Sequence, residues 1–163
     1  MPSRRKLLKL LKMERGQHQC LVFSLAMLLD ESPDALIEEL GHDGTEVWWP
    51  DWPVPHCYRG HHIQEVIDLC LGRGIFLTPI EFYPCTASAK SPHVSRPIWP
   101  LTRASARFQD YIRGKPGLLI GQAASGGGHA CAWDGHIVWD PNGRKYPLSD
   151  FRISECWILA ITS

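Results

Sequence analysis

The chain has 163 residues, of which 44% are hydrophobic and 21% charged, values typical of a globular domain with one core. Lys plus Arg and Asp plus Glu both number 17, so the formal charge is zero. Apart from a short basic start at Ser3–Lys6, the chain lacks the basic excess that is typical of proteins binding nucleic acid or anionic membranes. We therefore expect a single domain over residues 1–163 that has neither kind of partner.

The apolar residues near the start do not form a secretory signal. Lys9 and Lys12 interrupt the leucines there, whereas a signal needs an unbroken apolar run of roughly 7–15 residues. No other stretch approaches the roughly 20 apolar residues of a membrane span. We expect a cytoplasmic protein, in which most cysteines are free thiols that pack as small hydrophobic residues. The six cysteines are Cys20, Cys57, Cys70, Cys85, Cys131 and Cys156.

Four segments predict helices: 20–29, 34–40, 61–73 and 104–113. The first is apolar on nearly all sides, which indicates a buried central helix. The second begins with Ser32 as N-cap and Pro33 at its first position, and it ends at Gly41.

The last third of the chain predicts short strands separated by turn residues, after one earlier strand. The predicted strands are 75–83, 118–121, 129–133, 137–140 and 155–161. Asp134-Gly135 between two of them is a hairpin signal. Helices first and an antiparallel sheet last indicate an α+β fold rather than alternating βαβ units.

Cys20 is the first candidate for chemistry because it stands at the start of the buried helix. Backbone N–H groups and the helix dipole favour the thiolate there, and the thiolate is the nucleophilic form of cysteine. Taken alone, a cysteine at a helix start is more often part of a core.

His129 and Asp140 strengthen this interpretation. Counting back from the hairpin turn, both residues fall at the open end of the same hairpin. A carboxylate there can accept one imidazole N–H and leave the other nitrogen to face a thiol. Asn142 is a rival for this orienting role, but its Pro-Asn-Gly context is typical of a turn, which favours Asp140.

These residues resemble the papain-like cysteine peptidases, most closely the branch that contains the double-glycine bacteriocin-processing peptidases and small phage or prophage proteins. The matching pieces are Gln19-Cys20, Ser24–Leu28, Arg59–Glu65, His129–Trp133 and Asp140-Pro141. The resemblance implies N-terminal helices, with the nucleophile at the start of a central helix, packed against a C-terminal antiparallel sheet. It also implies a phage protein acting in the host cytoplasm on a peptide or protein substrate, without a cofactor.

The resemblance further implies that Cys20 is the nucleophile, His129 the general base and acid, and Asp140 the orienting residue. In the family a glutamine about two turns before the cysteine donates a hydrogen bond to the oxyanion. Glu14 stands near that distance, and a carboxylate repels an oxyanion. Gln17, and then Gln19, are the nearest substitutes. Losing one such donor typically slows a reaction about 100–1,000-fold.

The remaining candidates concern the substrate cleft and a metal. Trp48 and Trp49 lie in a loop rich in Trp, Pro and Gly, where aromatic side chains either rim a binding groove or cover the core. His62 either lines the cleft or caps a helix. Zinc ligation by residues such as His56 and Cys57 is not favoured, because their spacing matches no established pattern. We expect no metal.

Two functions of different classes remain open. The first is a cysteine hydrolase that cleaves a peptide or isopeptide through a thioester intermediate. The second is a papain-like binding module of weak or no activity that captures a host or structural partner, which Glu14 and the Trp-rich loop favour. Acyl transfer through the same thioester is a minor variant. The substrate and the oligomeric state are not indicated by the sequence.

Overall fold

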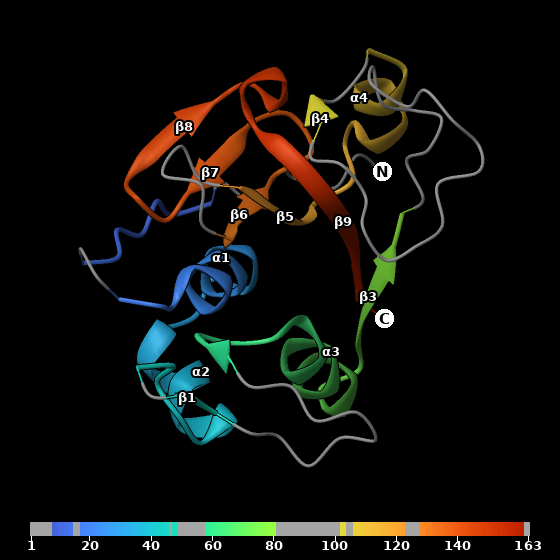
Figure 1. Ribbon diagram of the computed structural model, residues 1–163. Helices are drawn as coiled ribbons and strands as arrows, with labels where there is room; N and C mark the ends of the chain where they lie inside the picture. Colours follow the sequence, from blue (N-terminus) through green and yellow to red (C-terminus); the bar gives the residue numbers. More distant parts are fainter. Residues whose placement is uncertain are drawn as a thin grey trace, which may run out of the picture.

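The structure, a computed structural model, describes residues 8–14, 17–45, 47–48, 58–80, 102–103, 106–122 and 128–161 (Figure 1). The helices in these ranges are α1 (Cys20–Leu29), α2 (Pro33–Leu40), α3 (Ile63–Gly72), α4 (Ala106–Ile112) and the 3-10 turn η1 (Leu148–Asp150). The strands are β1 (Val47–Trp48), β2 (Tyr58–Arg59), β3 (Ile75–Pro79), β4 (Thr102–Arg103), β5 (Gly117–Gln122), β6 (Gly128–Trp133), β7 (Val138–Asp140), β8 (Arg144–Tyr146) and β9 (Arg152–Ile161). Helices packed on an antiparallel sheet confirm the α+β class.

The main sheet has the order β3-β9-β5-β6-β7-β8, and β4 adds to β9 beside this path. All of these neighbours pair antiparallel. The strand β9 therefore occupies an inner position between β3 and β5, although it follows every other described strand in the sequence. β1 and β2 form a separate two-stranded sheet.

The sheet is buried on both faces, because successive residues of a strand point to opposite sides. Along β5, Leu118 packs in one core cluster with α1, α2 and α3, whereas Leu119 packs in a second cluster with α4. Figure 1 shows α1 directly beneath β5 and β6, with α2 and α3 beyond it. Along β6, Ala130 and Ala132 face the α1 side, and their small side chains admit the helix.

Helix α1 is the central helix that its apolar sequence predicts. Six of its ten residues are buried, and Leu25 and Val22 are fully inaccessible. Ser24 is the polar exception within this buried face. Its hydroxyl lies 2.7 Å from Cys20 O and 3.1 Å from Ala130 O, the carbonyl of the residue next to His129 on β6. Ser24 thus ties the turn that carries Cys20 to the strand that carries His129.

Residues 8–14 run along the end of the β7–β8 hairpin instead of forming a helix. Lys12 forms an isolated antiparallel bridge with Asn142, and the Met13 N–H donates to Pro141 O over 2.7 Å. This pairing holds the segment before α1 against the corner that follows Asp140.

Most predicted helices and strands are confirmed, with shifts of a few residues at their ends. The predicted helix 61–73 begins at Ile63, and the strand predicted to begin at 155 begins at Arg152. The strand from Ile75 ends at Pro79, and residues 81–83 of the prediction lie outside the described residues. Strand β8 was not predicted. Among the residues that the structure describes, none of the helices has the length and apolar character needed to cross a membrane.

Candidate active site

Cys20 is the first residue of α1, and its surroundings hold the start of that helix in place. Gln19 is the N-cap residue and is almost buried, at 6% exposure. Its side-chain amide donates to Asp43 O over 2.9 Å, which ties the helix start to the loop after α2. Cys20 is partly exposed, whereas the other thiols in the described ranges, Cys70, Cys131 and Cys156, are buried.

The Arg59–Glu65 stretch supports the same loop. His62 caps α3, since its ring nitrogen accepts the Gln64 N–H over 3.1 Å and its own N–H donates to Glu65 over 2.7 Å. The other carboxylate oxygen of Glu65 lies 2.6 Å from His42 Nε2. The motif therefore braces the residues around Asp43, and through them Gln19.

His129 and Asp140 are brought together by the β6–β7 hairpin, as its open end predicts. Their side chains are 8% and 3% exposed, and His129 Nε2 donates to Asp140 Oδ1 over 3.0 Å. At the other end of the hairpin, Asp134 Oδ1 accepts the N–H groups of His136 and Ile137, which fixes the turn.

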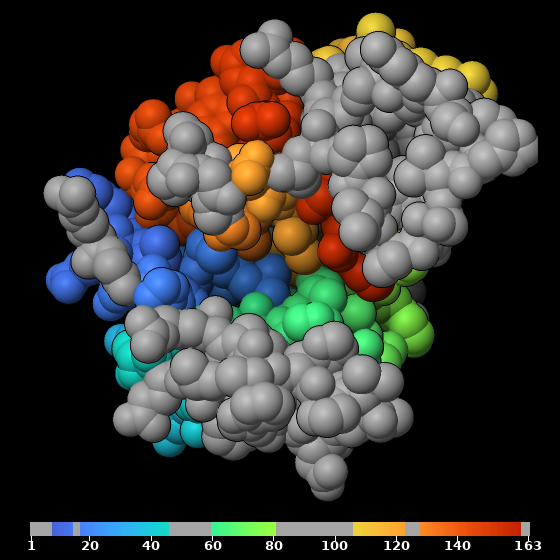
Figure 2. All heavy atoms as spheres, viewed as in Figure 1, coloured from blue at the N-terminus to red at the C-terminus, as the bar shows by residue number. Residues whose placement is uncertain are grey.

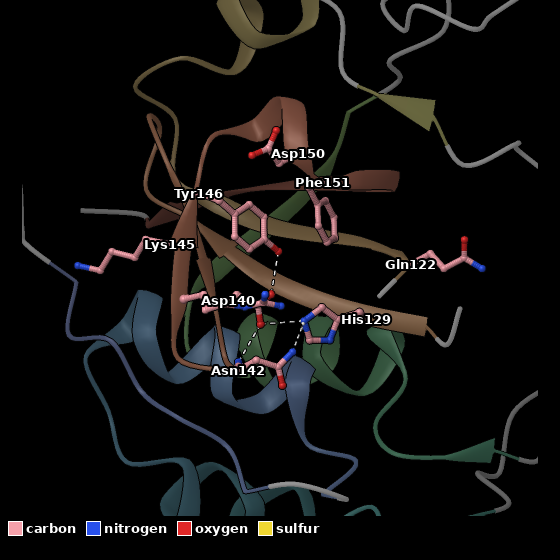
Figure 3. A pocket seen from close by; sticks show the side chains of 9 residues that line it. Gln122, His129, Asp140, Asn142, Lys145, Tyr146, Asp150 and Phe151 are labelled. Atoms are coloured by element: carbon pink, nitrogen blue, oxygen red, sulfur yellow. Dashed lines mark hydrogen bonds and ion pairs between the residues drawn. The ribbon is translucent and has the colours of Figure 1, made fainter. Parts of the chain in front are cut away.

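Asp140 has further partners besides the imidazole. The Asn142 N–H donates to Oδ1 over 2.8 Å, and the Tyr146 hydroxyl donates to Oδ2 over 2.8 Å. Figure 3 shows these side chains converging on the carboxylate, and it shows the side-chain amide of Asn142 beside His129. That amide lies 3.3 Å from Nε2. The rival orienter thus touches the same nitrogen, but Asp140 lies closer to it.

The electrostatics of the pair favour an imidazolium beside a carboxylate. Burial alone would lower the pKa of His129, but hydrogen bonds with Asp140, Cys131 and Cys20 raise it well above its ordinary value. Burial alone would raise the pKa of Asp140, yet hydrogen bonds from His129, Asn142 and Tyr146 hold it below its ordinary value. The Cys20 thiol is one of the hydrogen-bonding partners of this imidazole.

A second sulfur also contacts this imidazole. Cys131 is two residues from His129 on β6, so both side chains project from one face of the strand. The Cys131 sulfur lies 3.5 Å from the Tyr146 hydroxyl, and burial raises the pKa of this thiol. A buried, protonated thiol is a poor nucleophile. Of the two sulfurs, partly exposed Cys20 is the one that a substrate can reach.

A cavity of about 490 Å³ adjoins the imidazole. Figure 3 shows the side chains that line it, with Tyr146 pointing to Asp140 and Gln122 set apart from this group. Figure 2 shows α1 between the sheet and α3. The described residues that line it are Gln122, His129, Asp140, Asn142, Arg144, Lys145, Tyr146, Asp150 and Phe151.

The two oxyanion candidates differ in what their side chains do. The amide nitrogen of Gln19 is engaged with Asp43 O. Gln17 instead uses its side-chain oxygen to accept the Glu14 N–H over 2.9 Å, so its NH₂ group is the part that can donate to a ligand. Glu14 itself is exposed and directly follows Met13, which pairs with Pro141. Of the two, Gln17 has the side chain better arranged for this role.

Of the three residues expected at the substrate cleft, only His62 has a side chain that the structure describes. Trp49 lies outside the described residues, and for Trp48 the structure describes only the backbone, in β1. His62 is the N-cap of α3, so its ring has a structural task.

His129, Cys131 and Asp140 offer three donor atoms within 4.8 Å of one another, a set that can hold a metal ion. These groups are already engaged within the cluster. His129 bonds to Asp140, Cys131 contacts Tyr146, and Asp140 accepts from His129, Asn142 and Tyr146. Each of the three groups thus already has a hydrogen-bonding partner within the cluster.

Reasoning from the sequence missed Tyr146 and Ser24 as parts of this site. Tyr146 lies on an unpredicted strand, and no local pattern links it to Asp140. Ser24 carried a usable signal, because it is the one polar side chain after Cys20 in an apolar helix and stands four residues, or one turn, beyond it.

No family model and no curated protein matches the chain.

Proposed function

We propose that the protein is a thiol-dependent amide hydrolase of the papain-like type, acting on a peptide or isopeptide bond. The observation that carries the proposal is the position of His129, whose imidazole bonds to Asp140 over 3.0 Å and has hydrogen-bonding contact with Cys20. The exposure of Cys20 at a helix start and the resemblance of the flanking residues support it further.

In this proposal the Cys20 sulfur attacks the carbonyl carbon of the amide, and the carbonyl electrons move onto oxygen. Imidazolium His129 then gives its proton to the leaving nitrogen as the C–N bond breaks, and a thioester to Cys20 remains. Neutral His129 next takes a proton from water as the water oxygen attacks the thioester. The C–S bond breaks, the acid leaves, and the thiolate–imidazolium pair is restored.

Two donors are available for the oxyanion in this scheme. The first N–H groups of a helix have no acceptor within the helix, so the Cys20 N–H can donate to a substrate oxygen. The Gln17 NH₂ group is our candidate for the second donor, because its side-chain oxygen is held by Glu14 N–H.

Iodoacetamide labelling, read by peptide mass spectrometry, tests the proposal without knowledge of the substrate. We expect Cys20 to react faster than buried Cys70, whose pKa burial raises to about 11. We expect His129→Ala to slow labelling of Cys20 at least tenfold. His136→Ala is the matched control, because His136 is exposed beside the hairpin turn. Equal labelling of Cys20 in the wild type and in His129→Ala would refute the proposal.

The binding-module alternative is favoured by one observation from the sequence: Glu14 stands near the distance before Cys20 at which the family has its oxyanion glutamine. Glu14→Gln distinguishes the two. If the site turns over substrate, removing this negative charge should increase hydrolysis of a peptide thioester or amide library by about tenfold or more, since one oxyanion interaction is worth about 100–1,000-fold. If both proteins are inactive while a partner binds equally to wild type and Cys20→Ala, the binding module is the better description.

A further inference from the structure

Two side chains, His129 on β6 and Tyr146 on β8, and the backbone N–H of Asn142 meet at the carboxylate of Asp140 on β7. One oxygen, Oδ1, accepts His129 Nε2–H and the Asn142 N–H. The other, Oδ2, accepts the Tyr146 hydroxyl over 2.8 Å, and the oxygen of that hydroxyl lies 3.5 Å from the Cys131 sulfur. Since the phenol donates its proton to Asp140, its oxygen is free to accept the Cys131 S–H.

We propose that Tyr146, supported by Cys131, is a second positioning residue of the site, which holds the Asp140 carboxylate against His129. The proposal rests on the proposed function in that it concerns the same site. Tyr146 acts through Asp140 and has no part in bond making or breaking.

The sheet register explains why these side chains meet. Asp140 pairs with Arg144 and Val138 pairs with Tyr146 across β7 and β8, so Asp140 and Tyr146 are diagonal neighbours. Diagonal pairs lie within reach of a long aromatic side chain. Cys131 approaches from β6 on the other side of β7. The chain of contacts therefore spans β6, β7 and β8 and fixes the carboxylate from both sides.

The proton positions follow from the surroundings of each group. Burial and the neighbouring Cys131 and Asp140 raise the pKa of Tyr146, and burial raises the pKa of Cys131, so both remain protonated donors. The charged group that faces Asp140 is His129. Arg144 and Asp150 border the adjoining cavity. The Lys145 ammonium lies 3.5 Å from the centre of the Trp139 ring.

Tyr146→Phe tests the proposal, because it removes one hydroxyl and keeps the ring. The measurement is the pH titration of the side-chain carboxyl ¹³C resonance of Asp140 by NMR. This resonance is assigned because it is missing from the spectrum of Asp140→Asn. A hydrogen bond that stabilises the ionised form lowers a carboxyl pKa, so its removal should raise the Asp140 pKa by about one to two units. Tyr111→Phe is the matched control, since Tyr111 is 56% exposed on α4 and should leave the titration unchanged.

Cys131 supplies a second pair of variants that leave Tyr146 itself unchanged. Cys131→Ala should raise the Asp140 pKa by a smaller amount, and Cys131→Ser, which keeps a donor, should restore part of the shift. An unchanged Asp140 titration in folded Tyr146→Phe overturns the proposal. If that variant does not fold, an unchanged titration in Cys131→Ala overturns it instead.

A different measurement tests the proposed hydrolase function, so its failure can be distinguished from failure of the Tyr146 proposal. Where the function holds, Tyr146→Phe should move the acid limb of Cys20 alkylation to higher pH, in step with the Asp140 titration. If His129→Ala leaves the rate of Cys20 alkylation unchanged, the hydrolase proposal fails. The carboxyl titration still reports whether Tyr146 holds Asp140.

Discussion

Asp140→Asn is the sharpest test of the electrostatic description of the site. The change conserves the size of a side chain that is 3% exposed, but it removes the charge opposite His129. Asp140 accepts hydrogen bonds from His129, Asn142 and Tyr146. An asparagine has a single carbonyl oxygen, and its NH₂ group would face one or more of these donors.

The expected loss of stability follows from the distance between the two groups. At 3.0 Å, a unit charge pair gains about 5 kcal/mol at an effective dielectric constant of about 20. Part of this offsets the cost of burying both groups, and the asparagine oxygen retains one acceptor. Removing one partner of a buried pair typically costs about 3–5 kcal/mol. We therefore expect Asp140→Asn to lower the free energy of unfolding by about 3 kcal/mol.

The loss should depend on pH in a definite direction. The lowered pKa of Asp140 stabilises the fold above pH 3.8, its ordinary value, and this stabilisation is lost as the pH falls through the lower folded-state value. The raised pKa of His129 stabilises the fold below pH 6.5, and this stabilisation is lost as the pH rises through the higher folded-state value. The difference between wild type and variant should therefore be largest between pH 3.8 and 6.5 and should shrink on both sides.

Urea unfolding followed by circular dichroism at several pH values measures this difference. With an m-value of roughly 2 kcal/mol/M, the midpoint at pH 5.5 should fall by about 1.5 M. Asp68→Asn is the control, because Asp68 is exposed on α3 and should change the midpoint little. A variant midpoint equal to that of the wild type across this pH range would refute the imidazolium–carboxylate description.

Two further substitutions test how the site is held. Ser24→Ala removes the hydrogen bond to buried Ala130 O, so we expect a loss of about 1–2 kcal/mol in unfolding free energy together with slower Cys20 alkylation. Normal stability and alkylation would contradict the role given to Ser24. Gly121→Ala places a Cβ on the Arg152 carbonyl oxygen in the β5–β9 pairing, so thermal melting should show a loss of about 1–3 kcal/mol or no folding. Gly72→Ala is the control, because a Cβ on Gly72 at the end of α3 meets open space, and this change should be neutral or stabilising. Equal effects of the two changes would contradict the close approach of Gly121 to the Arg152 carbonyl.

Local patterns were enough to predict the elements that carry the proposed nucleophile and base. Helix α1 was predictable because ten consecutive residues favour one buried helix and begin at Cys20. The β6–β7 hairpin was predictable because Asp134-Gly135 is a turn signal between two apolar runs. Counting residues back from that turn along both strands was also enough to predict that His129 and Asp140 lie at the same end of the hairpin.

Features that depend on pairing between distant segments could not be predicted in this way. Strand β8 consists of Arg144-Lys145-Tyr146, which is too short and polar to show alternation, so the neighbour of Asp140 was missed with it. The bridge of Lys12 to Asn142 joins residues about 130 positions apart, and no periodicity indicates such a contact. The contacts of Asp140 other than that with His129 therefore came from the tertiary structure alone.

The inner position of β9 has a consequence for how the protein is made. β9 emerges from the ribosome after every other described strand, yet it pairs with β3 and β4 and with the edge of β5 that β6 leaves open. Until it arrives, these strands have unpaired edges, and the platform beneath His129 is incomplete. Contacts of this kind, between segments far apart in sequence, form slowly. Cys20, the proposed nucleophile, is made long before β9 and stays without its assembled partners until β9 has been translated, an interval in which unpaired strand edges favour aggregation.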